Sequence, residues 1–106
     1  MRWYQSAGTH LFRTYYFHEK QGLLPSTPGK LRRHEAITNV LNKFSERDQE
    51  ILKIYFSSEW GHDLDAVQQC TERYEVPEFM IWRTIHRAQR ALCDALYLTD
   101  PKTETT

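Results

Sequence analysis

The segment from residue 63 to residue 98 constrains this chain most, because it predicts two helices joined by a tight turn. A short helix is expected over about residues 64–73, and the turn is expected at residues 74–76. We expect a longer helix to begin at Pro77, because proline has a helical φ and lacks only an N–H that has no partner in the first turn. Two helices joined by three or four residues are the outline of a helix-turn-helix.

The longer of these two expected helices has two distinct faces. Apolar residues at i, i+4, i+7 and i+11 predict a face buried in a core: Ile81, Ile85, Ala88 and Leu92. Basic residues repeat this spacing on the opposite side, with a methionine one turn earlier: Arg83, Arg87, Arg90 and Met80. Such a helix is typical of the recognition helix of a DNA-binding protein. An ordinary surface helix with solvated arginines is the alternative.

Three segments of the chain resemble the fourth region of bacterial sigma factors. Residues 44–52 (FSERDQEIL) resemble its opening, and residues 70–76 (CTERYEV) resemble its helix and turn. Its recognition helix is similar to the stretch that contains Ile81, Arg87, Ala88, Arg90 and Leu92. The resemblance covers about residues 41–98 and includes small phage transcriptional regulators of the ArpU and RinA type. It implies an all-α fold with a sigma-like helix-turn-helix in its last three helices, and a regulator that binds double-stranded DNA.

The chain departs from this family where the recognition helix begins. Pro77 stands where the family usually has Ser or Thr. Phe79, Met80 and Trp82 stand where it usually has polar or charged residues that face the major groove. Large apolar side chains contribute little to base readout beyond contacts with thymine methyl groups. Phe79, Trp82 and His86 form a flank that we expect either another part of this chain or a second protein to cover.

The length of 106 residues predicts one domain with a hydrophobic core. We expect an aromatic N-terminal helix and linker in residues 1–27, a helical core in residues 28–98 and a polar tail in residues 99–106. No apolar run approaches the ~20 residues that span a bilayer, and the start lacks a signal-peptide pattern. We therefore expect a cytoplasmic protein with no membrane partner.

The N-terminal helix is expected over residues 3–21, and it is the most aromatic part of the chain: Trp3, Tyr4, Phe12, Tyr15, Tyr16 and Phe17. Each ring can bury about 150–250 Å², so we expect this helix to pack on the others as an added core layer. A partner or dimer surface is the alternative, and a stacking platform for nucleic-acid bases is a third. Residues 22–29, with two prolines and two glycines, are expected to form a linker.

Two more helices are expected between the linker and the helix-turn-helix. One covers residues 30–43, and Ser45 is expected to cap the other. Near the start of the first lie three candidate phosphate contacts, for which a solvated face is the alternative: Lys30, Arg32 and Arg33. Trp60, in the loop of residues 57–62, is expected to fold back on the core or, if exposed, to contact a partner.

The charge of the chain is balanced overall but uneven along its length. Fourteen basic and fourteen acidic residues give a net charge of zero, whereas a free-standing DNA-binding protein usually has a basic excess. Residues 1–45 carry seven Lys and Arg against two Asp and Glu, and residues 46–75 carry three against eight. This asymmetry permits a positive face, and it also permits the two halves to pair with each other.

We expect no enzyme, cofactor or metal, because the sequence has no catalytic constellation, phosphate-binding loop or set of metal ligands. Cys70 and Cys93 are expected to be free, buried thiols.

Two functional hypotheses follow. The first is a phage-type transcriptional regulator that binds duplex DNA, expected as a homodimer because one short helix reads few base pairs. Its expected DNA contacts are Arg83, Arg87, Arg90, Met80, Lys30, Arg32 and Arg33. The second is a protein-binding module on the same scaffold, directed at RNA polymerase, another regulator or a host nucleic-acid enzyme that it inhibits. Its expected partner contacts are Phe79, Trp82, His86 and Trp60.

Overall fold

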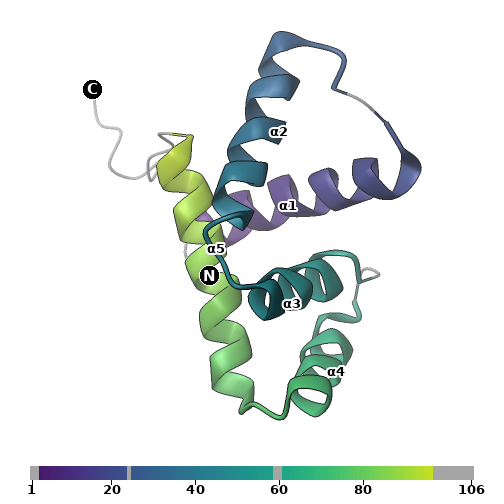
Figure 1. Cartoon of the computed structure of the whole chain (residues 1–106), viewed down its shortest axis with the longest axis vertical. Helices are drawn as coiled ribbons and strands as arrows, with labels where there is room; N and C mark the ends of the chain where they lie inside the picture. Colours follow the sequence, from purple (N-terminus) through teal and green to yellow (C-terminus); the bar gives the residue numbers. More distant parts are fainter. Residues whose placement is uncertain (1–2, 24, 59–60, 97–106) are drawn as a thin grey trace.

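A computed structural model describes residues 3–23, 25–58 and 61–96, with side chains from residue 7 onward. The described residues form five α-helices and no strand, which confirms the all-α fold expected from the sequence (Figure 1). The helices are α1 (Trp3–Gln21), α2 (Pro28–Leu41), α3 (Glu46–Phe56), α4 (Asp63–Tyr74) and α5 (Glu78–Ala95). None of the helices in these ranges is both long enough and apolar enough to cross a membrane.

Helix α5 is the element against which the other four pack. Figure 1 shows α1 and α2 meeting its C-terminal half, and α3 and α4 lying beside its N-terminal half. The apolar stripe predicted on α5 is fully buried, which confirms the period read from the sequence: Ile81, Ile85, Ala88 and Leu92. Because this stripe runs the length of α5, one helix joins the two helix pairs into a single core.

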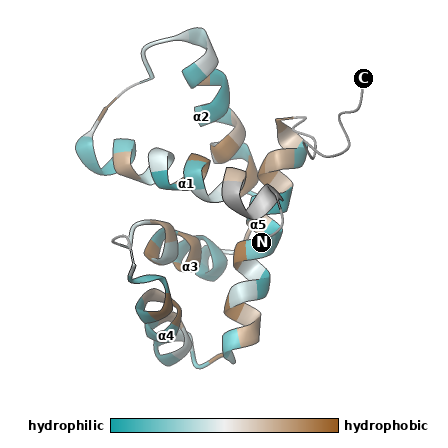
Figure 2. Ribbon diagram, turned by 180° about the vertical axis from the view of Figure 1, so that it is seen from behind, coloured by the Kyte–Doolittle hydropathy of each residue, from teal (hydrophilic) through white to brown (hydrophobic). Residues whose placement is uncertain are grey.

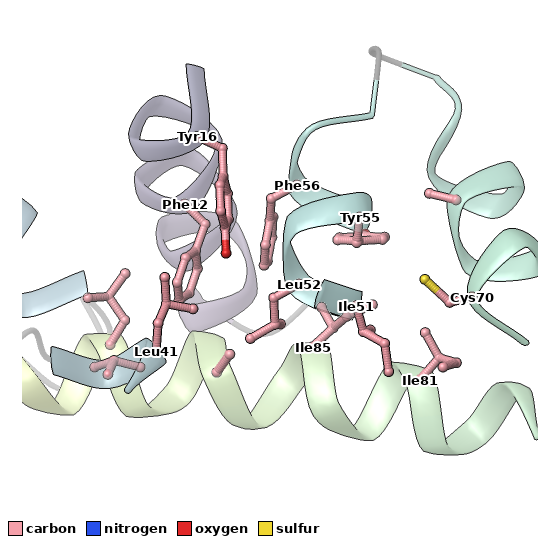
Figure 3. Close-up of a cluster of buried hydrophobic side chains, with 14 of the residues drawn as sticks. Phe12, Tyr16, Leu41, Ile51, Leu52, Tyr55, Phe56, Cys70, Ile81 and Ile85 are labelled. Carbon is pink, nitrogen blue, oxygen red and sulfur yellow. The ribbon is translucent and has the colours of Figure 1, made fainter. Parts of the chain in front are cut away.

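The aromatic helix α1 packs into this core, as expected. Phe12 of α1 is fully buried, and its ring stacks on Phe56 of α3 with centroids 4.7 Å apart and planes at 15°. Tyr16 lies one turn further along α1 beside the same phenylalanine (Figure 3). Burying such rings removes a large apolar area from water, so α1 is part of the hydrophobic core of the domain.

A glycine allows α1 to approach α5 closely. A Cβ placed on Gly8 would lie 2.8 Å from Cβ of Gln89 and 3.0 Å from its Cα, so a larger residue has no room there. Next to this contact, Nε2 of Gln89 donates a hydrogen bond of 2.7 Å to Oγ1 of Thr9. The two helices are therefore held by backbone proximity and by a polar contact between half-buried and buried side chains.

An arginine joins α1 to the connection between α3 and α4. Arg13 donates from Nη1 to the carbonyl oxygen of Ser58 and from Nη2 to Oδ1 of Asp63, both at 2.7 Å. The guanidinium also lies 6.0 Å from the ring centroid of Tyr55. Two charge-assisted hydrogen bonds from one planar group fix the angle between α1 and the start of α4.

The helix boundaries differ from expectation at two prolines. Helix α2 begins at Pro28 rather than at residue 30, because Thr27 caps it by accepting a hydrogen bond from N of Lys30. The expected linker therefore loses its last two residues to α2. Pro77 is the N-cap of α5 with ψ 151°, not its first helical residue, so α5 begins at Glu78. In both places proline adjoins the first turn, where its missing N–H has no cost.

The expectation for the third helix is confirmed at its cap. Ser45 has an extended backbone, and its Oγ accepts a hydrogen bond from N of Asp48, which lies in the first turn of α3. Acidic residues at Glu46 and Asp48 complement the positive end of the helix dipole. The polar tail expected over residues 99–106 lies outside the described residues.

Both cysteines are fully buried thiols, as expected. Cys70 of α4 lies near Ile81 of α5 in the core (Figure 3). Burial raises the pKa of both the Cys70 and the Cys93 thiol, because a thiolate would lose its hydration there. The two residues therefore act as small apolar side chains.

Candidate nucleic-acid interface

A left-handed residue sets the turn between α4 and α5. Glu75 caps α4 with φ 53° and ψ 44°, and two further residues, Val76 and Pro77, precede α5. Val76 is partly buried and packs against the core. At the end of α4, the hydroxyl of Tyr74 donates a hydrogen bond to Oε2 of Glu50 on α3. These contacts fix α4 against α3, and the tight turn then sets where α5 starts.

The outer face of α5 carries the predicted arginines. Arg83 and Arg87 are exposed, and no ion pair joins either to a carboxylate within the described ranges. The guanidinium of Arg87 lies 5.7 Å from the ring centroid of Phe44. Nε of Arg90 lies 3.5 Å from Oδ1 of Asp94, one turn later on the same helix. The structure thus places the three arginines on one helix and engages one of them with an acid.

The predicted apolar flank is only partly covered. Trp82 is half-buried, with its ring edge-on to Tyr55 of α3 at 5.6 Å, and its Nε1 donates to Oε1 of Glu78 at 3.1 Å. The ring of His86 lies 5.9 Å from that of Trp82. Phe79, in the first turn of α5, remains 65% exposed. Helix α3 therefore covers the Trp82 side of the flank, whereas Phe79 faces solvent.

The remaining predicted contacts that the structure describes do not together form one surface with the arginines of α5. Met80 is half-buried in the first turn of α5. Trp60 lies outside the described residues. The basic residues of α2 are exposed near its start: Lys30, Arg32 and Arg33. Figures 1 and 2 place the start of α2 at the opposite end of the long axis from the start of α5. The structure therefore separates the basic residues at the start of α2 from the start of α5, where a recognition helix would meet DNA.

The hydropathy of α2 agrees with this separation. Its ribbon is hydrophilic at the start and becomes hydrophobic where it approaches α5 (Figure 2). The buried residues of α2 are Ile37, Val40 and Leu41, all in its second half. The first half, with its cations, therefore extends beyond the main core.

Two features of this site were not found from the sequence. Phe44 packs partly buried against the core and also supports Arg87, but no local pattern links residues 43 positions apart. Residue 75 has a left-handed backbone, and glycine or asparagine usually occupies such a position. Because this chain has glutamate there, the sequence does not indicate the left-handed turn. Within the described ranges, no group of three or more His, Cys, Asp or Glu side chains is placed to hold a metal ion.

Comparison of the chain with models of known protein families, with curated proteins and with solved structures found no match. Its resemblance to the sigma-like helix-turn-helix therefore stands on the residues quoted above.

Proposed function

We propose that this protein binds double-stranded DNA through the outer face of α5, as a transcriptional regulator with a sigma-like helix-turn-helix formed by α3, α4 and α5. The observation that carries the proposal is the arginine face of α5, on which Arg83 and Arg87 are exposed and have no carboxylate partner in the described ranges. A helix buried along one face and cationic along the other has the form that enters a major groove.

Phosphate contacts account for most of the proposed affinity. Phe79 and Trp82 lie in the first two turns of α5, where base-reading residues usually lie, and neither supplies a hydrogen-bonding edge that suits base readout. Arg83, Arg87 and Arg90 have long, always-charged side chains that suit phosphate oxygens. We therefore expect modest sequence discrimination per protomer, and a homodimer that binds two half-sites would add to it.

The salt dependence of duplex binding tests this proposal quantitatively. For one protomer on a duplex with a single half-site, three phosphate contacts correspond to a slope of about −2.7 in log affinity against log salt. Raising the salt from about 50 mM to about 200 mM should then weaken binding about fortyfold. Fluorescence anisotropy with a labelled duplex and the full chain measures this slope. A chain that binds no duplex at the lower salt concentration contradicts the proposal.

A matched pair of double variants tests whether the duplex contacts the α5 arginines or responds only to the net charge of the chain. Arg83→Gln with Arg87→Gln should leave one phosphate contact, so the same salt step should weaken the residual binding only about 3.5-fold. Lys20→Gln with Arg32→Gln removes the same total charge from exposed residues near the end of α1 and the start of α2, outside the α5 face to which this proposal now limits the DNA contacts. Its slope should match that of the unmodified chain. Equal slopes for the two double variants would mean that net charge alone attracts the duplex.

A protein partner is the second candidate function, and the exposure of Phe79 favours it. This ring is 65% exposed, in the first turn of α5. Exposed aromatic residues beside arginines are enriched at the centres of protein interfaces. On this reading the start of α5 docks on a protein such as RNA polymerase.

Two exposed apolar side chains give the test of this second candidate. Phe79→Ser should abolish binding of the chain to purified RNA polymerase, measured by surface plasmon resonance. Leu64→Ser is the control, because Leu64 is 70% exposed at the start of α4 and its replacement removes a similar apolar area. Equal binding by both variants and the unmodified chain rejects Phe79 as the contact.

A further inference from the structure

A pocket opens between α1, α2 and the connection that joins them, apart from the arginine face of α5. Its volume is about 420 Å³, which lies within the range of small-molecule sites. Figure 1 shows α1 and α2 diverging from α5 toward this connection. The pocket belongs to the part of the chain that the proposed DNA contacts on α5 do not use.

The charged groups that line the pocket are basic. Lys30 and Arg33 of α2 line it together with His10, His18 and His34, and none of its described lining residues is acidic. No ion pair engages Lys30 or Arg33 among the residues described here. A concave site with two cations and no opposing carboxylate in its wall attracts anions.

One carboxylate lies beside the pocket without lining it. Oε1 of Glu19 is 3.7 Å from Nε2 of His34, so this acid engages one imidazole from outside the wall. The other four basic groups of the lining have no carboxylate contact in the described ranges.

The floor of the pocket is apolar and aromatic. Leu11 and Tyr15 come from α1 and Ile37 from α2, and the ring of Tyr15 lies 5.0 Å from that of His34. The hydroxyl of Tyr15 is 3.4 Å from Oγ1 of Thr38, which holds the ring against α2. Rings and branched side chains give a flat, weakly hydrated surface, on which an aromatic group can lie.

We propose that this pocket binds a small organic anion with a flat aromatic body. The anionic group would contact Lys30 and Arg33 at the rim, and the aromatic body would lie against Tyr15 and Ile37. A nucleoside phosphate and an aromatic sulfonate or carboxylate share this chemistry. The site is independent of the proposed DNA binding, because it uses α1 and α2 rather than the outer face of α5.

The test uses a matched pair of fluorescent probes on the full chain. Anilinonaphthalene sulfonate is a flat aromatic anion, and phenylnaphthylamine has the same rings without the charge. We expect one saturable site for the sulfonate and at least about fivefold weaker binding of the neutral probe. Amide chemical shifts in a titration with the sulfonate should move in residues 10–18 of α1 and residues 30–37 of α2. Absence of a saturable site, equal affinity of the two probes, or shifts confined to other helices would overturn the proposal.

Adjacent arginines on α2 provide matched variants. Arg33→Gln should weaken binding of the sulfonate about fivefold, because Arg33 lines the pocket at an exposed rim where water screens the contact. Arg32→Gln removes the same charge from the preceding, exposed residue, which does not line the pocket, and should change the affinity less than about twofold. Circular dichroism checks that both variants fold. Equal weakening by both would show that the probe responds to overall charge, and the pocket assignment would fail.

Discussion

Replacing Gly8 by alanine tests the packing of α1 on α5. The added Cβ favours the helix through alanine's higher helix propensity, but it also collides with Gln89 of α5. In an open helix, alanine is favoured over glycine by about 0.8–1.0 kcal/mol. At Gly8 the new Cβ would lie 2.8 Å from Cβ and 3.0 Å from Cα of Gln89. These atoms are at the root of the side chain and cannot rotate away, so α1 must shift. Overpacking of this kind costs about 1–3 kcal/mol, and we expect a net loss of about 1 kcal/mol.

The second glycine in a helix is the control. Gly29 lies in the first turn of α2, and no atom is within 4 Å of a Cβ built there. Gly29→Ala should therefore leave stability unchanged or raise it by up to about 1 kcal/mol. Urea unfolding followed by circular dichroism measures both variants, and Gly8→Ala should also lower the melting temperature by about 4–8 °C. If Gly8→Ala stabilises the protein as much as Gly29→Ala, then α1 does not rest on Gln89.

Three further predictions concern other parts of the core. Arg13→Gln should lower the free energy of unfolding in urea by about 1–2 kcal/mol, because it removes two charge-assisted hydrogen bonds at a partly exposed site that includes Asp63; an unchanged midpoint would contradict this. Cys70 and Cys93 should react with a thiol reagent only after denaturation, since burial shields both sulfurs and raises their pKa; rapid reaction in the native protein would count against it. Burial also raises the pKa of the Tyr16 hydroxyl above its ordinary value of about 10, so the unfolded chain loses this proton first. Stability in urea should accordingly fall as the pH rises above about 10, and Tyr16→Phe should reduce that fall.

Much of the fold follows from local patterns in the sequence. The apolar stripe of α5 repeats at helical spacing over twelve residues, and that period alone identifies its buried face. Ser45 followed by acidic residues marks the start of α3 through a hydrogen bond between near neighbours. These features are predictable because the residues that form them lie within one or two helical turns of each other.

The errors at α2 and α5 have a different origin. Thr27 before Pro28 is a helix-start signal, but the prolines and glycines of residues 22–29 also predict a linker, and the two signals overlap at residues 28 and 29. At Pro77 the backbone conformation decides between the N-cap and the first helical residue, and proline is compatible with both. Boundaries of this kind differ by one or two residues and do not change the arrangement of the helices.

Long-range contacts account for what sequence patterns did not predict. Gly8 meets Gln89, and Tyr55 meets Trp82, across 81 and 27 positions respectively. The residues around Gly8 do not show whether this glycine allows another helix to approach closely or only weakens α1. Likewise, the aromatic flank of α5 gave no indication of which ring α3 covers. Such contacts depend on the crossing of helices, which periodicity does not specify.

The packing of α5 also bears on how its arginines can act. Helices α3 and α4 pack against the N-terminal half of α5, and α1 and α2 pack against its C-terminal half. The backbone that carries the arginines is therefore held in place along its length. Arg87 is further restrained, because its guanidinium lies over Phe44. A side chain that is already ordered loses less conformational entropy on contact with a phosphate than a free one. No aromatic ring in the part of the chain that the structure describes supports Arg83 in this way, so equal contacts from the two residues would give unequal affinity, with Arg87 contributing more. This difference comes from the folded chain, since both residues carry the same charge on the same helix face.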